Sequence, residues 1–377
     1  MAKKKGKILV AMSGGVDSSV AAALLVNAGY DVTGMFAVNY ESEENDADIA
    51  LAGRSAAETC WRGDYNDALR VAAKLKIPLL RLNFVKEYKK HVLDYMYAEY
   101  RAGRTPNPDV LCNKFVKFGV WLKKAKELGF DKIATGHYAR LRRECQISNV
   151  KFPIKSKIQN PKPENICMVK AKDDNKDQTY FLHQLTQTQL KHVLFPIGKF
   201  TKPEVRALAD KFKLPTAKKE ESMGICFVGE VPMKKFLMKK IKTKKGKIIL
   251  SSGEIVGEHD GLAFYTIGER IGIAGHNEKP LYVVDKNIKQ NKLVVGYDAD
   301  PLLFKKEIKI TETNWIAGRA PKFPLKCEVR LRHRQPLQKC VINKNKVLFT
   351  QPQRAVTPGQ FAVFYAKGVC LGGGVIS

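Results

Sequence analysis

The residues with the clearest chemical potential form the run Ser13-Gly14-Gly15-Val16-Asp17-Ser18-Ser19 near the N-terminus. The apolar residues 8–12 before this run are typical of a buried strand in a parallel sheet, and residues 20–26 after it have the pattern of a helix. A glycine turn between a strand and a helix directs free backbone N–H groups and the positive end of the helix dipole toward one point. We therefore expect a phosphate site here, with Asp17 able to hold Mg²⁺.

The spacing of this loop separates it from two common phosphate-binding loops. No Gly-Lys-Ser/Thr follows, so it is not a Walker loop, and its glycines do not fit G-x-G-x-x-G. Ser-Gly-Gly-x-Asp-Ser at the end of a first strand instead resembles the pyrophosphate loop of enzymes that split ATP into AMP and pyrophosphate. The alternative is an ordinary glycine-rich turn, and the motif by itself indicates adenylation without naming a substrate.

A second chemical candidate is Cys112, which follows the turn Asn107-Pro108-Asp109. The two prolines of this stretch argue against a helix there, while residues 115–128 have a helical pattern. Cys112 is thus expected near a helix start, where the dipole and Lys114 would lower the pKa of its thiol below about 8.5. Asp109 is close enough in sequence to accept a proton. The alternative is that Cys112 is a small buried apolar residue.

Three further stretches carry weaker signals. Gly136 and His137 follow a short expected strand at 132–134, and His137 could contact a phosphate or a base or be a structural histidine. The polar run 176–178 comes before an aromatic and apolar helix, where it could be the edge of a site or only a charged helix start. Cys226 lies between glycines, which by itself indicates little.

Strands and helices alternate along the first part of the chain, which favours an α/β fold with a doubly wound parallel sheet. In such sheets ligands bind beyond the carboxyl ends of the strands, where the glycine loop lies. The expected strands are residues 8–12, 31–38, 78–82 and 132–134, and the expected helices are 20–26, 65–75, 85–101 and 115–128.

The helix signals fade after about residue 230. Residues 248–295 contain short β-type runs and predict a small central β domain, while strands and Pro/Gly turns from residue 308 predict a C-terminal β-barrel. Both are expected to grasp RNA, with a purely structural role as the alternative. The expected domains are 1–230, 231–303 and 304–377, with a solvated surface excursion at 145–166.

Composition bounds the partners and the compartment. The chain of 377 residues has 66 Lys and Arg against 37 Asp and Glu, a formal charge of +29, which favours a polyanion such as nucleic acid. A lysine-rich proteome would produce part of the same excess. The eight cysteines contain no CxxC pair, which favours a reducing compartment, and no signal segment or membrane-spanning stretch is present. We therefore expect a cytoplasmic protein without a membrane partner.

Taken together, the motifs resemble those of the tRNA-specific 2-thiouridylases, in the same order and at similar spacing along essentially the whole chain. They are SGGVDS, NPDVLCNKFVKFG, ATGHYAR, KDQTYFL and ESMGICFVGE, followed by DGLAFYTIGERIGI, RLRHRQPL, QRAVTPGQFAVFY and CLGGGVI. These enzymes replace the 2-oxygen of the wobble uridine with sulfur in tRNAs for Lys, Glu and Gln. The resemblance implies a pyrophosphate-loop ATPase domain of the adenine nucleotide alpha hydrolase type.

The resemblance also implies roles. ATP would adenylate the uridine carbonyl, since its oxygen is a poor leaving group, and a persulfide would supply sulfur. Cys226 would carry the persulfide, Cys112 would be the nucleophile that releases the sulfur through a transient Cys112–Cys226 disulfide, and Asp109 would be the general base. The positions that match the nucleotide site are Ala11, Met12, Ser13, Gly14, Gly15, Val16, Asp17, Ser18, Ala37 and Gly136, with Mg²⁺ at Asp17.

For RNA, the resemblance implies that the target base is extruded from its stack and meets Asn107, Pro108 and Asp109. A cysteine desulfurase or a sulfur-relay protein would be the donor. Glu269 and Ile271 depart from the family pattern of Gln and Lys, which puts an RNA contact of the central domain in doubt. The other positions that match tRNA contacts are His137, Lys176, Asp177, Gln178, Arg332, His333 and Gln360.

Three alternatives remain open at this point. An Fe–S cluster held by Asp109, Cys112 and Cys226 could deliver the sulfur, although ligands so far apart cannot be recognised by spacing and we favour the persulfide route. A pyrophosphate-loop ATPase that activates a small molecule would not need both cysteines. A non-enzymatic tRNA-binding protein would form no AMP, and the intact loop at residues 13–18 argues against it.

Overall fold

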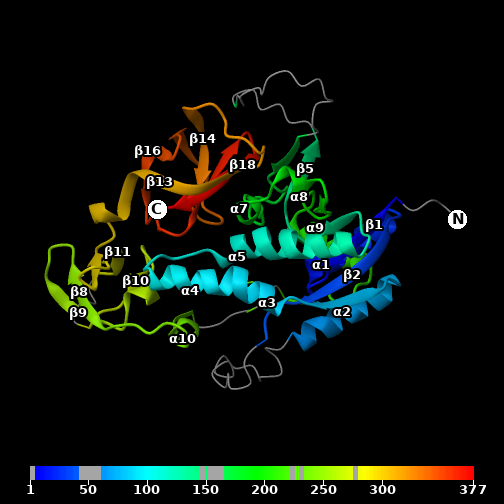
Figure 1. Cartoon of the computed structure of the whole chain (residues 1–377), viewed down its shortest axis with the longest axis horizontal. Helices are drawn as coiled ribbons and strands as arrows, with labels where there is room; N and C mark the ends of the chain where they lie inside the picture. The colour runs from blue at the N-terminus through cyan, green and yellow to red at the C-terminus, as the bar shows by residue number, and fades with distance from the viewer. Residues whose placement is uncertain are drawn as a thin grey trace.

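The computed structural model describes residues 5–41, 61–143, 150, 165–220, 226, 228, 233–274 and 279–377. Most of the surface excursion expected at 145–166 lies outside these ranges. Figure 1 shows an α/β region that carries the N-terminus, a small β region in yellow-green, and a barrel in orange and red that carries the C-terminus.

The α/β region is built on a parallel sheet with strand order β3-β2-β1-β4-β7. The order reverses at β1, which pairs with β2 on one side and β4 on the other, so a ligand crevice is expected at the carboxyl ends of β1 and β4. The doubly wound sheet predicted from the sequence is confirmed. Its strands are β1 (Lys7–Ala11), β2 (Asp31–Val38), β3 (Leu79–Asn83), β4 (Lys132–Ala134) and β7 (Val193–Leu194).

Alternation along β1 decides what each face of the sheet contacts, because successive side chains of a strand point to opposite faces. Ile8 and Val10 pack in a buried cluster with α1 (Val16–Asn27), α2 (Arg62–Leu75) and α9 (Lys202–Lys211). Leu9 joins the cluster on the opposite face. A run of buried apolar residues, as expected for a central parallel strand, thus holds helices on both sides.

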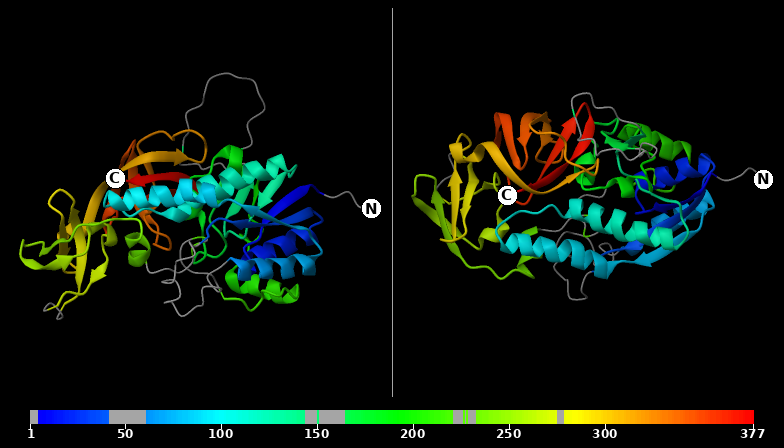
Figure 2. Two further views of the ribbon diagram at one scale, coloured as in Figure 1. Left: turned by 60° about the horizontal axis from the view of Figure 1, so that its bottom comes forward. Right: turned by 45° about the horizontal axis from the view of Figure 1, so that its top comes forward.

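The helices on the Leu9 side form two long rods that lie side by side (Figures 1 and 2). One rod is α3 (Val85–Tyr88), the π-helix η2 (Lys89–Leu93) and α4 (Asp94–Arg101). The other is α5 (Pro108–Leu111), the π-helix η3 (Cys112–Val120) and α6 (Trp121–Glu127).

The second rod begins earlier than the prolines suggested. Pro108 is its first residue, where a missing N–H costs nothing, and the Asn107 side chain caps it by accepting a hydrogen bond from Val110 N (3.3 Å). The expectation of no helix before residue 115 was therefore wrong. Cys112 lies in the second turn of the rod instead of near its start.

The small central region has a five-stranded sheet of order β10-β11-β12-β8-β9 with a core of its own. The predicted central β domain is confirmed. Its elements are β8 (Gly246–Leu250), β9 (Ile255–His259), η4 (Leu262–Phe264), β10 (Arg270–Ile271), β11 (Leu281–Asn287) and β12 (Lys292–Gly296), and α10 (Met233–Met238) precedes them.

The predicted C-terminal barrel is also confirmed, and it closes because β13 pairs with both β16 and β18. The hairpin β5–β6 from the α/β region extends the barrel sheet, with Val169 opposite Val369. The barrel elements are η5 (Pro301–Leu303), β13 (Phe304–Trp315), β14 (Leu325–Arg330), β15 (Gln338–Asn343), β16 (Lys346–Arg354), β17 (Phe361–Ala366) and β18 (Val369–Ile376).

A buried ion pair fastens the barrel to the α/β region. Asp177, fully buried just before α7 (Thr179–Leu182), lies 3.1 Å from the guanidinium of Arg330 at the end of β14. The same carboxylate accepts a hydrogen bond from the Thr179 hydroxyl (2.9 Å). Removing one partner of such a pair leaves an uncompensated buried charge and costs about 3–5 kcal/mol. The remaining elements of the α/β region are the hairpin strands β5 (Arg140–Arg143) and β6 (Ile166–Val169) and the short helix α8 (Gln187–Leu190).

Candidate functional site: a nucleotide loop and a pair of thiols

The glycine loop lies at the strand-order reversal, directly after β1. Gly14 has φ +76°, and a Cβ there would lie 2.3 Å from the carbonyl oxygen of Asp64. Gly136, which follows β4, approaches the same loop so closely that a Cβ would lie 2.7 Å from Ser18 N. Gly14 is therefore required by its backbone conformation and by lack of space, and Gly136 by lack of space. The close approach of Gly136 brings the end of β4 against the loop that follows β1.

Hydrogen bonds hold the loop in shape. The hydroxyl of Ser18 accepts from Ser13 N (3.2 Å) and donates to Gly15 O (3.1 Å). Ala11 ends β1, Met12 is buried behind the loop, and Val16 begins α1. The predicted nucleotide residues at 11–18 thus share one compact turn at a helix N-terminus, the arrangement that favours an anion.

Asp17 has two partners at this turn. Its Oδ1 accepts hydrogen bonds from the Tyr138 hydroxyl (2.8 Å) and from Lys202 Nζ (2.8 Å). Lys202 is largely buried at the first position of α9, where Thr201 and Glu204 form a capping box. The sequence analysis did not single out Lys202. In the structure its ammonium group lies beside the predicted phosphate site.

The end of β2 adds a recognition group that the sequence did not reveal. Ala37 is half-buried there, and its carbonyl accepts a hydrogen bond from Asn39 Nδ2 (3.0 Å). The Oδ1 atom of Asn39 is buried and accepts no hydrogen bond from the described residues. A buried acceptor of this kind suits an exocyclic amino group such as that of adenine.

The thiol site brings Cys226 together with Asp109 and Cys112, two predicted residues that lie far from it in the sequence. Cys112 is fully buried, Cys226 is half-buried, and the two side chains lie close enough for Cys112 to influence the pKa of Cys226. The backbone N–H of Cys226 donates to Asp109 Oδ1 (3.1 Å), and the hydroxyl of Tyr88 on α3 donates to the Cys226 carbonyl (2.7 Å). The carboxylate and both sulfur atoms therefore share one site.

The environment of Cys226 disfavours its thiolate. The hydrogen bond with Cys112, burial, and the carboxylate of Asp109 raise the pKa of the Cys226 thiol well above its ordinary value, while Lys117 lowers it. The Nζ atom of Lys117 lies 3.7 Å from Cys226 Sγ. The lysine expected beside Cys112 was Lys114, but the ammonium of Lys114 lies over the Phe115 ring, 5.0 Å from its centroid.

The comparisons with known proteins cover the whole of this architecture. Models of the tRNA methyl transferase HUP domain, the tRNA methyl transferase PRC-barrel domain and the aminomethyltransferase beta-barrel domain match residues 6–230, 234–297 and 305–376. A protein named "tRNA-specific 2-thiouridylase MnmA" from Francisella tularensis subsp. holarctica (strain FTNF002-00 / FTA) is 43% identical over 383 residues, covering 98% of this chain and 99% of the relative. The chain belongs to the tRNA-specific 2-thiouridylase family.

Other comparisons agree with that membership or add nothing to it. The 2-thiouridylase of Francisella tularensis subsp. novicida (strain U112) is also 43% identical, over 98% of this chain and 99% of its own length. A solved NMN synthetase from Francisella tularensis has 14% identity and a TM-score of 0.31, covering 58% of this chain and 67% of that chain. The family resemblance predicted from the sequence is thus confirmed by the close relatives.

Among the positions matched to 2-thiouridylase tRNA contacts, Gln360 joins two domains. Its amide nitrogen donates to the carbonyl oxygens of Thr105 (2.9 Å) and Pro106 (3.0 Å), and its oxygen accepts from Asn107 Nδ2 (3.3 Å). The barrel thereby holds the segment that leads into Pro108 and Asp109. In this structure the side chain of Gln360 positions that segment.

Three more of these positions have their side chains inside the protein. His137 is buried, its Nδ1 lies 2.7 Å from the Thr135 hydroxyl, and burial together with Lys117 holds its pKa well below the usual value. Asp177 is the buried partner of Arg330. Gln178 is half-buried and accepts a hydrogen bond from Tyr138 N (2.9 Å), while the neighbouring Lys176 is half-buried.

Of the last two positions, Arg332 lies where the barrel meets the central domain, and His333 lies where the barrel meets α7. The Arg332 side chain is exposed, yet its Nη2 donates to the carbonyl oxygens of Ala355 (2.6 Å) and Ile267 (3.2 Å). His333 packs against the Phe181 ring, with 4.6 Å between centroids. Burial and the nearby Arg334 lower the pKa of His333 to about 4, so it is neutral at pH 7.

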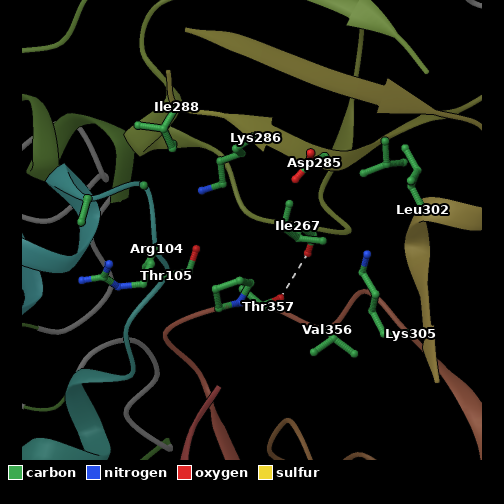
Figure 3. Close-up of a pocket in the computed structure, with 14 residues that line it drawn as sticks. Arg104, Thr105, Ile267, Asp285, Lys286, Ile288, Leu302, Lys305, Val356 and Thr357 are labelled. Atoms are coloured by element: carbon green, nitrogen blue, oxygen red, sulfur yellow. Dashed lines mark hydrogen bonds between the residues drawn. The ribbon is translucent and has the colours of Figure 1, made fainter. Parts of the chain in front are cut away.

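A hollow of about 220 Å³ lies where the three domains meet (Figure 3). Arg104 and Thr105 line it from the α/β region, Asp285 and Lys286 from the central domain, and Lys305 from the barrel. Burial lowers the pKa of Lys286 to about 8, with Glu269 acting in the opposite direction. The departure from the family pattern at Glu269 thus places a carboxylate near a buried lysine.

Proposed function

We propose that this protein is an ATP-dependent tRNA-uridine 2-sulfurtransferase that thiolates the wobble uridine of tRNAs for Lys, Glu and Gln. One observation carries the proposal: Cys226, whose backbone N–H donates to Asp109, lies beside Cys112 in a chain whose first strand ends in a pyrophosphate loop. Family membership supports the same activity. Adenylation and sulfur transfer then take place in one domain.

The first half of the reaction activates the uridine. The loop residues 13–18 bind the phosphates of ATP at the N-terminus of α1, and Ala37 and Gly136 border the nucleotide. The 2-oxygen of uridine attacks the α-phosphorus, pyrophosphate leaves, and the oxygen becomes part of AMP. The sulfur then enters at a carbon that carries a good leaving group.

The second half transfers sulfur. The outer sulfur of a Cys226 persulfide attacks carbon 2 of the base, and AMP leaves with the carbon–oxygen electron pair. Cys112, after giving its proton to Asp109, attacks Cys226 Sγ, and the sulfur–sulfur electron pair stays with the sulfur on the base. The products are 2-thiouridine and a Cys112–Cys226 disulfide, which a thiol reductant returns to the free thiols.

Mg²⁺ is expected to accompany ATP, and Asp17 is the residue of the loop that suits it. A carboxylate oxygen is the ligand class that Mg²⁺ prefers, and Asp17 points into the turn where Tyr138 and Lys202 meet it. When bound, the ion would neutralise phosphate charge. Lys202, which pairs with Asp17 here, would then be available to the phosphates.

The RNA partner is expected to be held mainly by charge. The excess of 29 positive charges favours the tRNA backbone, and such binding should weaken steeply with salt. Asn107, Pro108 and Asp109 are proposed to meet the extruded base, and Lys176, Gln178 and Arg332 are proposed contacts beyond it. For Gln360, His137, Asp177 and His333, the contacts described above support a positioning role instead.

The sulfur donor is proposed to be a cysteine desulfurase or a sulfur-relay protein, and the compartment the cytoplasm. Among the described cysteines, five are free thiols and Cys167 is disulfide-bonded. No helix in the described part of the chain is long and apolar enough to cross a membrane. The proposed domain limits, 1–230, 231–303 and 304–377, place the donor's target Cys226 in the first domain.

The Fe–S route is the alternative for the same product. Within the described ranges, no group of three His, Cys, Asp or Glu side chains is arranged to hold a metal ion. Cys112 and Cys226 are free thiols that lie close together, and Asp109 accepts a hydrogen bond from the backbone N–H of Cys226. Both observations support the persulfide route. Iron analysis of anaerobically purified protein, with an absorption band near roughly 400 nm, would favour the cluster.

The decisive experiment measures sulfur incorporation into tRNA. Purified protein, ATP, Mg²⁺, a lysine tRNA transcript and a cysteine desulfurase with cysteine are combined, and thiolated tRNA is detected by its retardation on a mercury-containing gel. The variants are Cys226→Ser and Cys112→Ser, with Cys327→Ser in the barrel as the matched control. AMP formation and pyrophosphate release in the first turnover are measured in parallel.

We expect an ATP-dependent shift in the wild type and in Cys327→Ser, and none in Cys226→Ser or Cys112→Ser. Because AMP leaves only when sulfur attacks, its formation should fall in Cys226→Ser, while pyrophosphate release in the first turnover, which reports adenylation, should persist in all four proteins. A tRNA-binding protein that produces neither AMP nor a shifted band would contradict the proposal. A band shift that survives in Cys226→Ser would show that Cys226 is not the persulfide carrier, although the protein would still be a thiolase.

A further inference from the structure

The π-helix η3 determines which side chain reaches the sulfur atoms. In an α-helix each residue turns by about 100°, so residues five apart face directions about 140° apart. A π-helix closes its hydrogen bonds between residues five apart, which brings such residues to one face, and such segments are frequent at functional sites. Cys112 and Lys117 are five apart within η3 (Cys112–Val120), so the wide turn presents both to the thiol site.

Lys117 contacts the sulfur of Cys226. Its Nζ lies 3.7 Å from Cys226 Sγ and donates a hydrogen bond to that atom. Burial lowers the pKa of Lys117, but Cys226, Cys112 and Asp109 together hold it above its usual value. Lys117 therefore remains an ammonium group at neutral pH, and it is the cation that lowers the pKa of Cys226.

We propose that Lys117 is a further catalytic residue, whose ammonium group stabilises the Cys226 thiolate while that sulfur accepts sulfur from the donor. The inference rests on the proposed function. In the loading step the Cys226 thiolate attacks the outer sulfur of a donor persulfide. The new bond joins that sulfur to Cys226, the donor's sulfur–sulfur bond breaks, and the donor leaves as a thiolate with the electron pair.

The groups around Cys226 explain why a cation is needed. Two groups beside Cys226 disfavour its thiolate by raising its pKa. Cys112 stabilises the thiol form, and the carboxylate of Asp109 repels the thiolate charge. Tyr88 contributes a neutral hydroxyl, since burial holds its pKa well above the usual value. Only a thiolate is an effective nucleophile for sulfur loading. Lys117 supplies the opposing positive charge on the same helical face as Cys112.

The experiment follows alkylation of Cys226 by iodoacetamide as a function of pH, read on its peptide by mass spectrometry. It compares the full-length wild type with Lys117→Met, Lys117→Gln and Lys117→Arg. Lys114→Met is the matched control, because that ammonium lies over Phe115. Labelling of Cys226 by a desulfurase with [³⁵S]cysteine tests loading itself, and pyrophosphate release with tRNA in the first turnover tests adenylation.

Removal of the charge should slow alkylation and ³⁵S loading of Cys226 by at least ~10-fold at pH 8 and move the alkylation profile to higher pH. Lys117→Arg should retain most of the wild-type rate of alkylation and loading, and Lys114→Met should retain all of it. Pyrophosphate release in the first turnover should change little in every variant. Wild-type alkylation in folded Lys117→Met, or in Lys117→Gln if the methionine variant does not fold, would overturn the inference. Alkylation needs neither tRNA nor donor, so this outcome is separate from failure of the proposed function.

Discussion

The nucleotide loop and the thiol site lie in one domain but are built in opposite ways. The loop is a single contiguous run, residues 13–18, shaped by backbone and closed by Gly136. The thiol site takes Tyr88, Asp109, Cys112 and Cys226 from segments far apart in the chain. A contiguous loop leaves a motif in the sequence, whereas a composite site depends on how rods and loops pack.

The two sites also differ in what their charges do. At the loop, Lys202 and Asp17 form an ion pair that bound phosphate and Mg²⁺ can rearrange. At the thiol site, burial and a carboxylate oppose the thiolate of Cys226, and Lys117 offsets them in part. The loop is therefore suited to binding an anion that arrives charged, and the thiol site to controlling when a sulfur becomes charged.

The largest expected effect separates the loop from the thiols. In Gly136→Ala the added Cβ would lie 2.7 Å from Ser18 N, so the loop must move, and a misplacement of about 1 Å costs about 100-fold in rate. We expect AMP formation to fall by at least that factor while iodoacetamide alkylation of Cys226 is unchanged. Gly63→Ala, which has open space at its Cβ, is the control, and equal AMP formation in both variants would refute the prediction.

The converse change should affect only the thiol half. Asp109→Asn keeps an acceptor for the N–H of Cys226 but cannot take a proton, and loss of a general base typically costs about 10²–10⁴-fold. We expect tRNA thiolation on the mercury gel to fall in that range while pyrophosphate release in the first turnover stays within about threefold. If Asp109→Asn thiolates normally and Asp109→Ala does not, Asp109 positions Cys226 and is not the base.

Lys202→Met should have a smaller effect, confined to the nucleotide half. A charge-assisted contact to phosphate is lost, which corresponds to about a tenfold rise in KM for ATP. Steady-state AMP formation over a range of ATP concentrations measures it. Lys199→Met is a nearby control, because that lysine lies over the Phe200 ring. An unchanged KM would show that Lys202 only neutralises Asp17.

The smallest expected effect tests the connection between the barrel and the thiol site. Gln360→Ala removes three hydrogen bonds to the segment 105–107, a loss of about 1–3 kcal/mol that includes unpaired backbone carbonyls. Thermal unfolding should occur a few degrees lower, and thiolation should fall by about fivefold with little change in first-turnover pyrophosphate release. Gln338→Ala, at a half-buried residue whose side chain donates locally to Pro336 O, should match the wild type.

Much of the fold could be predicted because it depends on local pattern. The buried apolar run of β1 and the strand at 31–38 are properties of short segments. The helix start at Pro108 was missed, since a proline that breaks a helix interior is compatible with its first turn. The pairing of β6 with β18 could not be anticipated, because it joins strands about 200 residues apart in sequence and neither strand signals its partner.

The sequence by itself determined the chemical inventory: a pyrophosphate loop, two cysteines with an aspartate, a basic composition and the family to which the chain belongs. Tertiary structure decided how these groups work. The π-turn brings Lys117 instead of Lys114 to the sulfur, Lys202 of α9 meets Asp17 of the neighbouring α1, and Gln360 holds the segment before Pro108. The reason is physical, since residue type sets what a group can do, whereas charge state and reactivity depend on neighbours that only packing supplies.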